Sequence, residues 1–297
     1  MRKVYTIMFG VSITLTVAAL LTIAVLGLNL GVDFKGGSVM EWQFKEKAPS
    51  IADIQKELAP KLTGKELAVA AEGDRNIIIK TSELSEADHQ VVLGVAKDKF
   101  SSLGVEEKSF DSIGPVVGKE LKDKSITAII LVLLGIMIYI AGVFRKLSRA
   151  LSSWVMGLSA IIALIHDVSI PVGIFSLLGH FYHIEISAVF VAAVLTILGY
   201  SVSDTVVVFD RVRENIIRGG LKEQFAEVVH KSIMQTLARS INTNITVLLS
   251  LIAIYFFGGE SIKYFSLALI IGIFLGAYSS IFVASPILVW FNKRGRR

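Results

Sequence analysis

The chain of 297 residues contains no cysteine, which excludes disulfides, thiolate metal ligands and cysteine nucleophiles. It also lacks a glycine-rich loop of the kind that cradles phosphates, so we predict no nucleotide site. A weak candidate for a metal site is the outer-loop group His180, His183 and Glu185, which we interpret as an interfacial turn. These absences predict a protein that is not an enzyme, with no catalytic residue, no metal site and no cofactor.

Charged residues are also scarce, at 19%, whereas hydrophobic residues reach 53% and the mean hydropathy is +0.66. About 20 apolar residues are needed to cross ~30 Å of hydrocarbon. Six segments are long enough, namely residues 7–30, 126–144, 154–178, 187–209, 240–258 and 264–291. We therefore predict a polytopic α-helical membrane protein with six transmembrane helices. The first segment resembles a cleavable signal, but its length and the five further spans favour a retained anchor.

Lysine and arginine gather in the short loops on one side of these spans, and the positive-inside rule places that side in the cytoplasm. The residues are Arg2, Lys3, Arg145, Lys146, Arg149, Arg211, Arg213, Arg218, Lys222, Lys231, Lys293, Arg294, Arg296 and Arg297. Both termini are then cytoplasmic, in a multi-pass protein of the cytoplasmic (inner) membrane. Because the net charge of +5 is spread over separate membrane-flanking loops, it indicates contact with lipid headgroups and not with nucleic acid.

A single large polar insert separates the first two spans. It divides the chain into a first span (1–30), an extracytoplasmic domain (31–123) and the remaining five helices (124–297). Periodicity within the insert predicts the order βαββαβ of a ferredoxin-like α+β domain. The predicted strands are 38–44, 66–71, 76–81 and 105–113, and the predicted helices are 50–62 and 85–103. Ser50 and Ser85 are predicted N-caps, the second with Asp88 three residues later.

Asp204 is the most informative residue, because it lies within the apolar run of the fourth span. A carboxylate at membrane depth costs several kcal/mol, so such residues usually face a partner or a water-filled path and mark ion pathways. At a rise of 1.5 Å per residue, Asp204 lies ~25 Å from the outer start of its span and Arg239 ~28 Å from the outer end of the fifth. Since the two match in depth, alternate contact and separation could switch Asp204 between proton release and uptake.

His166 and Asp167 in the third span extend this predicted proton relay. Structural alternatives stay open for each member of the relay: Arg239 as a helix end snorkelling to headgroups, His166 as a helix-packing donor, Asp167 as a hydrogen-bond acceptor, and Asp204 as a purely structural residue. Polar residues predicted to line the path are Ser201, Ser203, Thr205, Ser240, Asn242, Thr243 and Thr246. The run on the fifth span, which also contains Asn244, could equally stabilise helix contacts.

Two further sets of residues have predicted structural roles. The sixth span carries small residues at every fourth position, which permits close helix approach and predicts packing. These residues are Gly272, Gly276, Ser280 and Ala284. The junctions of the outer domain with the first two spans contain a second set: Asp33, Gly36, Gly37, Gly114, Pro115 and Gly118.

Four motifs in this order resemble the SecF family of protein-export subunits, within the resistance–nodulation–division superfamily. They are Val32-Asp-Phe-Lys-Gly-Gly37, Ser112-Ile-Gly-Pro-Val-Val-Gly118, His166-Asp167 and the block from Gly199 to Asn215. The segment from Gln235 to Thr246 and Phe257-Gly-Gly259 extend the resemblance over essentially the whole chain. The chain departs from the common Thr-Ser-x-Thr-Thr pattern, with Asn244 replacing the serine and Val247 the final threonine.

The resemblance implies an accessory to the Sec translocon that uses the proton motive force to assist preprotein translocation, with protons as the coupling ion. In the family, the residues matched by Asp204 and Arg239 belong to the proton-conducting region, together with an acid of SecD. The implied partners are SecD as the obligate other half, SecYEG, YajC, YidC, the translocating preprotein and membrane lipids.

Two alternatives differ in the features that they require. A half-transporter of the same superfamily that exports small molecules or lipids would share the spans and acids, but usually has larger outer domains and two six-span halves. A non-transporting assembly factor would need no acid at membrane depth.

Overall fold

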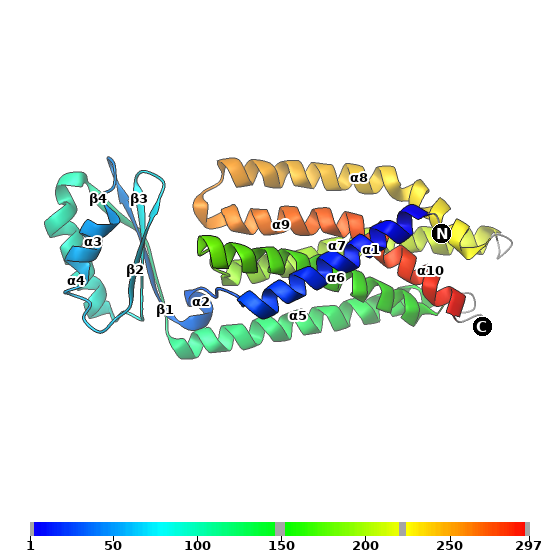
Figure 1. Cartoon of the computed structure of the whole chain (residues 1–297), viewed down its shortest axis with the longest axis horizontal. Coiled ribbons are helices and arrows are strands. Elements are labelled where there is room, and N and C mark those ends of the chain that lie inside the picture. The colour runs from blue at the N-terminus through cyan, green and yellow to red at the C-terminus, as the bar shows by residue number, and fades with distance from the viewer. Residues whose placement is uncertain (1–2, 146–151, 220–223, 295–297) are drawn as a thin grey trace. The chain divides into compact units, whose positions relative to one another are not determined.

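The computed structural model describes residues 3–145, 152–219 and 224–294. The predicted cytoplasmic residues Arg2, Lys146, Arg149, Lys222, Arg296 and Arg297 lie outside the described residues. Two compact units are present: one is Leu30–Ser125, and the other combines the chain up to Asn29 with the chain from Ile126 onward. The elements are labelled in Figure 1.

Long apolar helices confirm the prediction of six spans in the described chain. They are α1 (Lys3–Leu26), α5 (Pro115–Val143), α6 (Ser153–Tyr182), α7 (Ala188–Gly219), α8 (Phe225–Phe257) and a sixth span built from α9 (Glu260–Ser279), the π-helical η4 (Ser280–Ala284) and α10 (Ser285–Arg294). Most of these helices extend beyond the apolar runs that predicted them, because a helix continues into its polar flanks until a cap or breaker ends it.

Two spans differ from the prediction in a way that the backbone explains. The first helix ends at Leu26 and not at residue 30, because Gly27 adopts a left-handed conformation (φ 71°) and donates its N–H to Ile23. The sixth span is interrupted by the π-helical turn just before Pro286. A proline lacks an N–H and its ring clashes with the carbonyl four residues earlier, so the helix cannot continue with regular bonds there.

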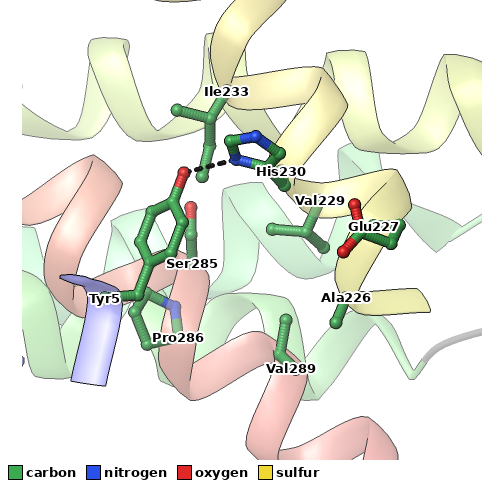
Figure 2. Close-up of a pocket in the computed structure, with 9 residues that line it drawn as sticks. All are labelled: Tyr5, Ala226, Glu227, Val229, His230, Ile233, Ser285, Pro286 and Val289. Carbon is green, nitrogen blue, oxygen red and sulfur yellow. Dashed lines mark hydrogen bonds between the residues drawn. The ribbon is translucent and has the colours of Figure 1, made fainter. Parts of the chain in front are cut away.

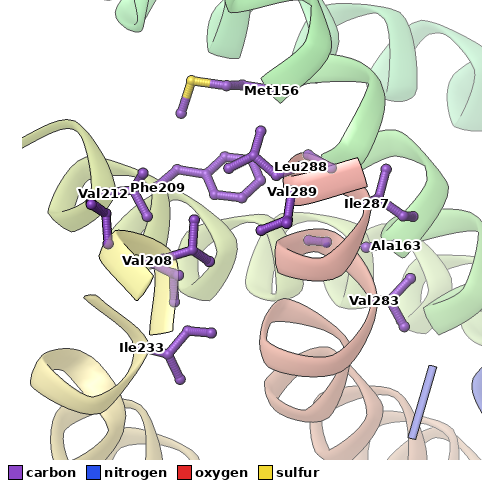
Figure 3. Close-up of a cluster of buried hydrophobic side chains, with 14 of the residues drawn as sticks. Met156, Ala163, Val208, Phe209, Val212, Ile233, Val283, Ile287, Leu288 and Val289 are labelled. Carbon is purple, nitrogen blue, oxygen red and sulfur yellow. The ribbon is translucent and has the colours of Figure 1, made fainter. Parts of the chain in front are cut away.

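The core of the helical unit lies at the end of the bundle that holds both termini (Figure 1). There, Met156 of α6, Phe209 of α7, Ile233 of α8 and Leu288 of α10 interlock (Figure 3). By contrast, α5 exposes large apolar side chains such as Leu131. Lipid is as apolar as leucine, so close packing and interhelical hydrogen bonds, not escape from water, hold such helices together.

The unit Leu30–Ser125 has the predicted βαββαβ order. Its elements are β1 (Gly37–Phe44), α3 (Ile51–Leu58), β2 (Leu67–Glu72), β3 (Asn76–Thr81), α4 (Glu86–Phe100), the 3-10 turn η1 (Ser101–Leu103) and β4 (Val105–Ile113), preceded by the short α2 (Val32–Lys35). The strands pair antiparallel in the order β2-β3-β1-β4. Alternate strand residues, including Trp42 and Ile79, join Ile54 of α3 and Val92 of α4 in one buried cluster.

Both predicted N-caps are confirmed. The hydroxyl of Ser50 accepts the N–H of Asp53, and Ser85 forms a reciprocal capping box with Asp88. The predicted helix ends were too late: α3 ends at Leu58 because Pro60 follows, and α4 gives way to a 3-10 turn after Phe100.

Candidate functional site

Asp204 is buried between α7 and α8, with 7% of its surface exposed. Its Oδ1 accepts a hydrogen bond from Ser240 Oγ over 2.8 Å, and its Oδ2 accepts one from Asn244 Nδ2 over 2.6 Å. Ser240 and Asn244 lie one turn apart on α8, so they present their side chains on the same face. Both oxygens of the acid are therefore held by neutral donors.

Asp167 on α6 is fully buried and connects three helices. Its Oδ2 accepts hydrogen bonds from Ser201 Oγ of α7 (2.5 Å) and Ser279 Oγ of α9 (2.7 Å), while His166 Nδ1 lies 2.8 Å from its Oδ1. Ser201, which binds Asp167, precedes Asp204 by about one turn of α7, so this helix connects the surroundings of the two buried acids.

His166 is buried beside this acid, and its ring stacks on Tyr278 with centroids 6.1 Å apart. The hydroxyl of Tyr278 donates to the backbone oxygen of Met8 on α1 and accepts from Ser12 Oγ. Within the described chain, His166 Nε2 has no hydrogen-bond partner. The buried polar groups thus extend from α8 through α7 and α6 to α1.

Arg239, by contrast, is exposed on α8, and no ion pair joins it to Asp204 in the described part of the chain. It directly precedes Ser240, and consecutive residues of a helix point about 100° apart. When Ser240 faces Asp204, Arg239 must therefore point to another side of α8.

The predicted path-lining residues divide into a buried and an exposed set. Ser201, Thr205 and Ser240 are buried around the two acids, and Thr205 Oγ1 lies 2.9 Å from Ser280 Oγ. The exposed set consists of Ser203, Asn242, Thr243 and Thr246. Sequence reasoning did not assign Ser279, because a lone serine in an apolar helix gives no signal until α6 and α9 are placed side by side.

The small residues of the sixth span lie against α7. A Cβ atom added to Gly276 would lie 2.9 Å from Ser201 Cβ, and one added to Gly272 would collide with Ile197. Farther along, Ser280 meets Thr205, and Ala284 is completely buried. These small residues therefore allow close approach of the sixth span to α7.

The motif residues of the outer unit pack backbone against backbone. Gly36 has a φ of 81°, and a Cβ there would lie 2.8 Å from the Cα of Pro115. A Cβ on Gly118 would lie 3.1 Å from the carbonyl carbon of Phe34 in α2. Of the other predicted junction residues, Asp33 is in the first turn of α2, Gly37 opens β1 with a φ of 136°, and Gly114 lies beside Glu83.

No cluster of three or more His, Cys, Asp or Glu residues that could hold a metal ion occurs among the described residues. His183 instead caps the end of α6 in a left-handed conformation (φ 58°), and its backbone oxygen accepts from Asn29 Nδ2.

One small pocket lies between α1, α8 and α10, where Tyr5 Oη is 2.7 Å from His230 Nδ1 (Figure 2). Its volume of about 10 Å³ has room for roughly one water molecule. The pocket is therefore too small for an organic substrate.

Comparison with known protein families gives two matches. Residues 95–294 match the family described as "Protein export membrane protein SecD/SecF, C-terminal", and residues 22–48 match the "SecD/SecF GG Motif". The second match covers Gly36 and Gly37.

Full-length relatives and a solved structure agree with these matches. The protein translocase subunit SecF of Thermobaculum terrenum is 43% identical, and the alignment covers 95% of this chain and 90% of the relative. The subunit SecDF of Brucella abortus is 35% identical, but this chain spans only 36% of it. A crystal structure of SecDF from Thermus superposes with a TM-score of 0.83 at 32% identity, covering 98% of this chain and 38% of that one.

Proposed function

The chain belongs to the SecD/SecF family of protein-export membrane proteins, and we propose that it is the SecF half of a SecDF accessory complex of the Sec translocon. In this role it uses the proton motive force to assist preprotein translocation across the cytoplasmic membrane. The exporter alternative is not favoured, because the relatives that match over nearly their full length are named as translocase subunits.

The observation that carries the proposal is the buried acid Asp204, held by Ser240 and Asn244 between two membrane-spanning helices. A carboxyl group at that depth is costly and is retained where it binds an ion or a proton. We propose the proton as the coupling ion, because a carboxyl group can take up and release one as its surroundings change. Asp167 and His166 continue the polar connection toward α1 and form the second part of the proposed relay.

The exposed polar residues of α8 support a need for SecD. Arg239, Asn242, Thr243 and Thr246 would face hydrocarbon if the bundle stood alone in lipid. Because an arginine at membrane depth is paired with an acid or a water-filled cavity, this surface fits a partner bundle that supplies a carboxylate. Fusion of the two halves in the SecDF relatives supports the same pairing. SecYEG, YajC, YidC, the preprotein and lipids are the further proposed partners.

Arg239 is the proposed second member of the switch at Asp204. In the described structure, the neutral donors Ser240 and Asn244 bind the carboxylate of Asp204, and Arg239 does not contact it. Approach and withdrawal of the arginine would alternately pair and release the carboxylate, which couples proton movement to movement of α8 against α7. The proposed orientation has both termini in the cytoplasm and the unit Leu30–Ser125 outside it, as the positive-inside rule predicts from the basic residues near the helix ends.

The test is secretion of a reporter preprotein in cells whose only copy of this chain is the Asp204→Asn variant. Co-purification with SecD measures assembly in parallel, and Asp210→Asn is the matched control. Asp210 is on the same helix but exposed, and it pairs with Arg213 over 3.0 Å. We expect Asp204→Asn to assemble and to export at the level of the null strain, and the control to export normally. Normal export by Asp204→Asn would refute the proposed relay.

A further inference from the structure

The side chain of Asn244 uses only part of its hydrogen-bonding capacity beside Asp204. Its Nδ2 donates to Asp204 Oδ2 over 2.6 Å and to the backbone oxygen of Ser240 over 2.8 Å. Its Oδ1 is buried and has no hydrogen-bond partner among the residues that the structure describes. A buried polar atom without a partner costs free energy, so an unused amide oxygen next to an acid is a notable exception.

The contacts of Asn244 fix the orientation of its amide. Nδ2 faces two acceptors, the carboxyl oxygen of Asp204 and the carbonyl oxygen of Ser240. The reverse orientation would place the amide oxygen against both of them. With Ser240 Oγ donating to the other oxygen of Asp204, the arrangement presents donors to both carboxyl oxygens, as suits the ionised acid.

A protonated Asp204 has an O–H donor that needs an acceptor, and the buried amide oxygen of Asn244 is an acceptor that no other group uses among the described residues. Rotation of the Asn244 amide by half a turn exchanges Nδ2 with Oδ1, and the terminal torsion of asparagine is broad and roughly two-fold. We propose that Asn244 is the positioning residue that holds Asp204 in both protonation states, its amide turning over when the acid takes up a proton. This inference rests on the proposed role of Asp204 as the proton carrier.

Other groups near Asp204 are engaged elsewhere. On α7, the hydroxyl of Tyr200 donates to the backbone oxygen of Thr243 over 3.4 Å. On α6, Asp167 is bonded to Ser201, and in η4, Ser280 is bonded to Thr205. On α8, Arg239 is exposed. Among the described residues only Ser240 and Asn244 make hydrogen bonds to Asp204. A serine hydroxyl can accept as well as donate, but of these two side chains Asn244 is the one with a buried acceptor atom that has no partner.

Turning the amide also has a consequence for α8. The bond from Nδ2 to the backbone oxygen of Ser240 lies within this helix and must break when Oδ1 takes the place of Nδ2. Each protonation of Asp204 therefore removes one side-chain bond from the helix that carries Arg239. Through this bond, Asn244 would couple the protonation of Asp204 to the hydrogen bonding of the α8 backbone at Ser240.

The experiment uses the full chain with SecD in proteoliposomes and compares Asn244→Leu, Asn244→Ser and the control Ser250→Leu. Leucine is close to asparagine in size but has no polar atom, whereas a serine hydroxyl both donates and accepts. Ser250 is exposed on α8 and donates only within that helix, to Thr246. The measured quantities are the infrared C=O stretch of protonated Asp204, which an Asp204→Asn sample identifies by its loss, and the export of a reporter preprotein.

We expect Asn244→Leu to shift the carbonyl band to the position of a carboxyl group that donates no hydrogen bond, and to lower export about tenfold, as loss of a bond to a charged group predicts. Asn244→Ser should keep the band near its parent position and restore export, and Ser250→Leu should change neither. An unchanged band in Asn244→Leu, or a serine variant that behaves like leucine, would overturn the inference. If Asp204→Asn removes no carboxyl band and exports normally, the proposed function itself fails.

Discussion

Replacing Asp167 tests whether this buried acid holds the bundle together or moves protons. Asp167→Ala removes the shared acceptor of His166, Ser201 and Ser279, so three buried donors on α6, α7 and α9 lose their partner at once. Interhelical hydrogen bonds in membranes contribute about 0.6 kcal/mol each on average, and two of the three bonds, those from Ser201 and Ser279, join different helices, which gives a loss of roughly 1 kcal/mol. The cavity left by the carboxyl group adds to this loss.

A second variant, Asp167→Asn, distinguishes loss of the negative charge from loss of the hydrogen-bond acceptors. Its amide oxygen can accept hydrogen bonds from the two serines. Its NH₂ can donate to His166 Nδ1 when the imidazole is neutral and carries its proton on Nε2. We therefore expect the asparagine variant to keep most of the stability, because the network depends on acceptor geometry more than on charge. In thermal unfolding of the purified chain in detergent, the alanine variant should melt roughly 2–4 °C below the parent for each kcal/mol lost, on the scale known for soluble domains.

Export measured on the same two variants separates the two roles of the acid. A stable Asp167→Asn protein that fails to export assigns Asp167 to the relay, whereas normal export assigns it to structure alone. The exposed Asp210→Ala serves as the control for removal of a carboxylate and should shift the melting temperature little. An alanine variant that melts with the parent would refute the reasoning, because it would mean that the three donors find other partners.

Two further predictions concern one residue in each unit. Gly276→Val should lower the stability of the bundle by about 1–3 kcal/mol in detergent unfolding, since a Cβ there would lie 2.9 Å from Ser201 Cβ. The control Gly135→Ala should leave the stability unchanged, because nothing lies within 4 Å of its added Cβ. In the outer unit, hydrogen bonds from Lys65 and then from Ser85 lower the pKa of Asp88 from 3.8 to about 2. Because the pKa of Asp88 is lower in the folded state, its ionised form stabilises the fold above pH 3.8, and this stabilisation is lost as the pH falls toward 2. Asp88→Asn should therefore abolish this part of the pH dependence of stability, measured by amide hydrogen exchange in α4.

The six spans, the βαββαβ order and the helix caps could be predicted from the amino-acid sequence, because each depends on neighbours along the chain. Hydropathy over about 20 residues decides whether a helix can cross a membrane, and Ser85 finds Asp88 within a single turn. The same local reasoning identified Asp204 as exceptional, since a carboxylate in an apolar run is visible without any tertiary contact. It failed at the end of the first span and at the break in the sixth, where the conformation of Gly27 and the π-helical turn before Pro286 set the boundaries.

Which polar residues meet depends on how the helices pack, and local sequence does not show this. Ser279 is 112 residues from Asp167 along the chain, and Asn244 is 40 from Asp204, so no spacing rule could pair them. The packing of α9 beside α6 and the rotation of α8 about its own axis decide those contacts. The same rotation turns Ser240 inward and Arg239 outward, because adjacent residues on a helix face different sides and packing selects one of them.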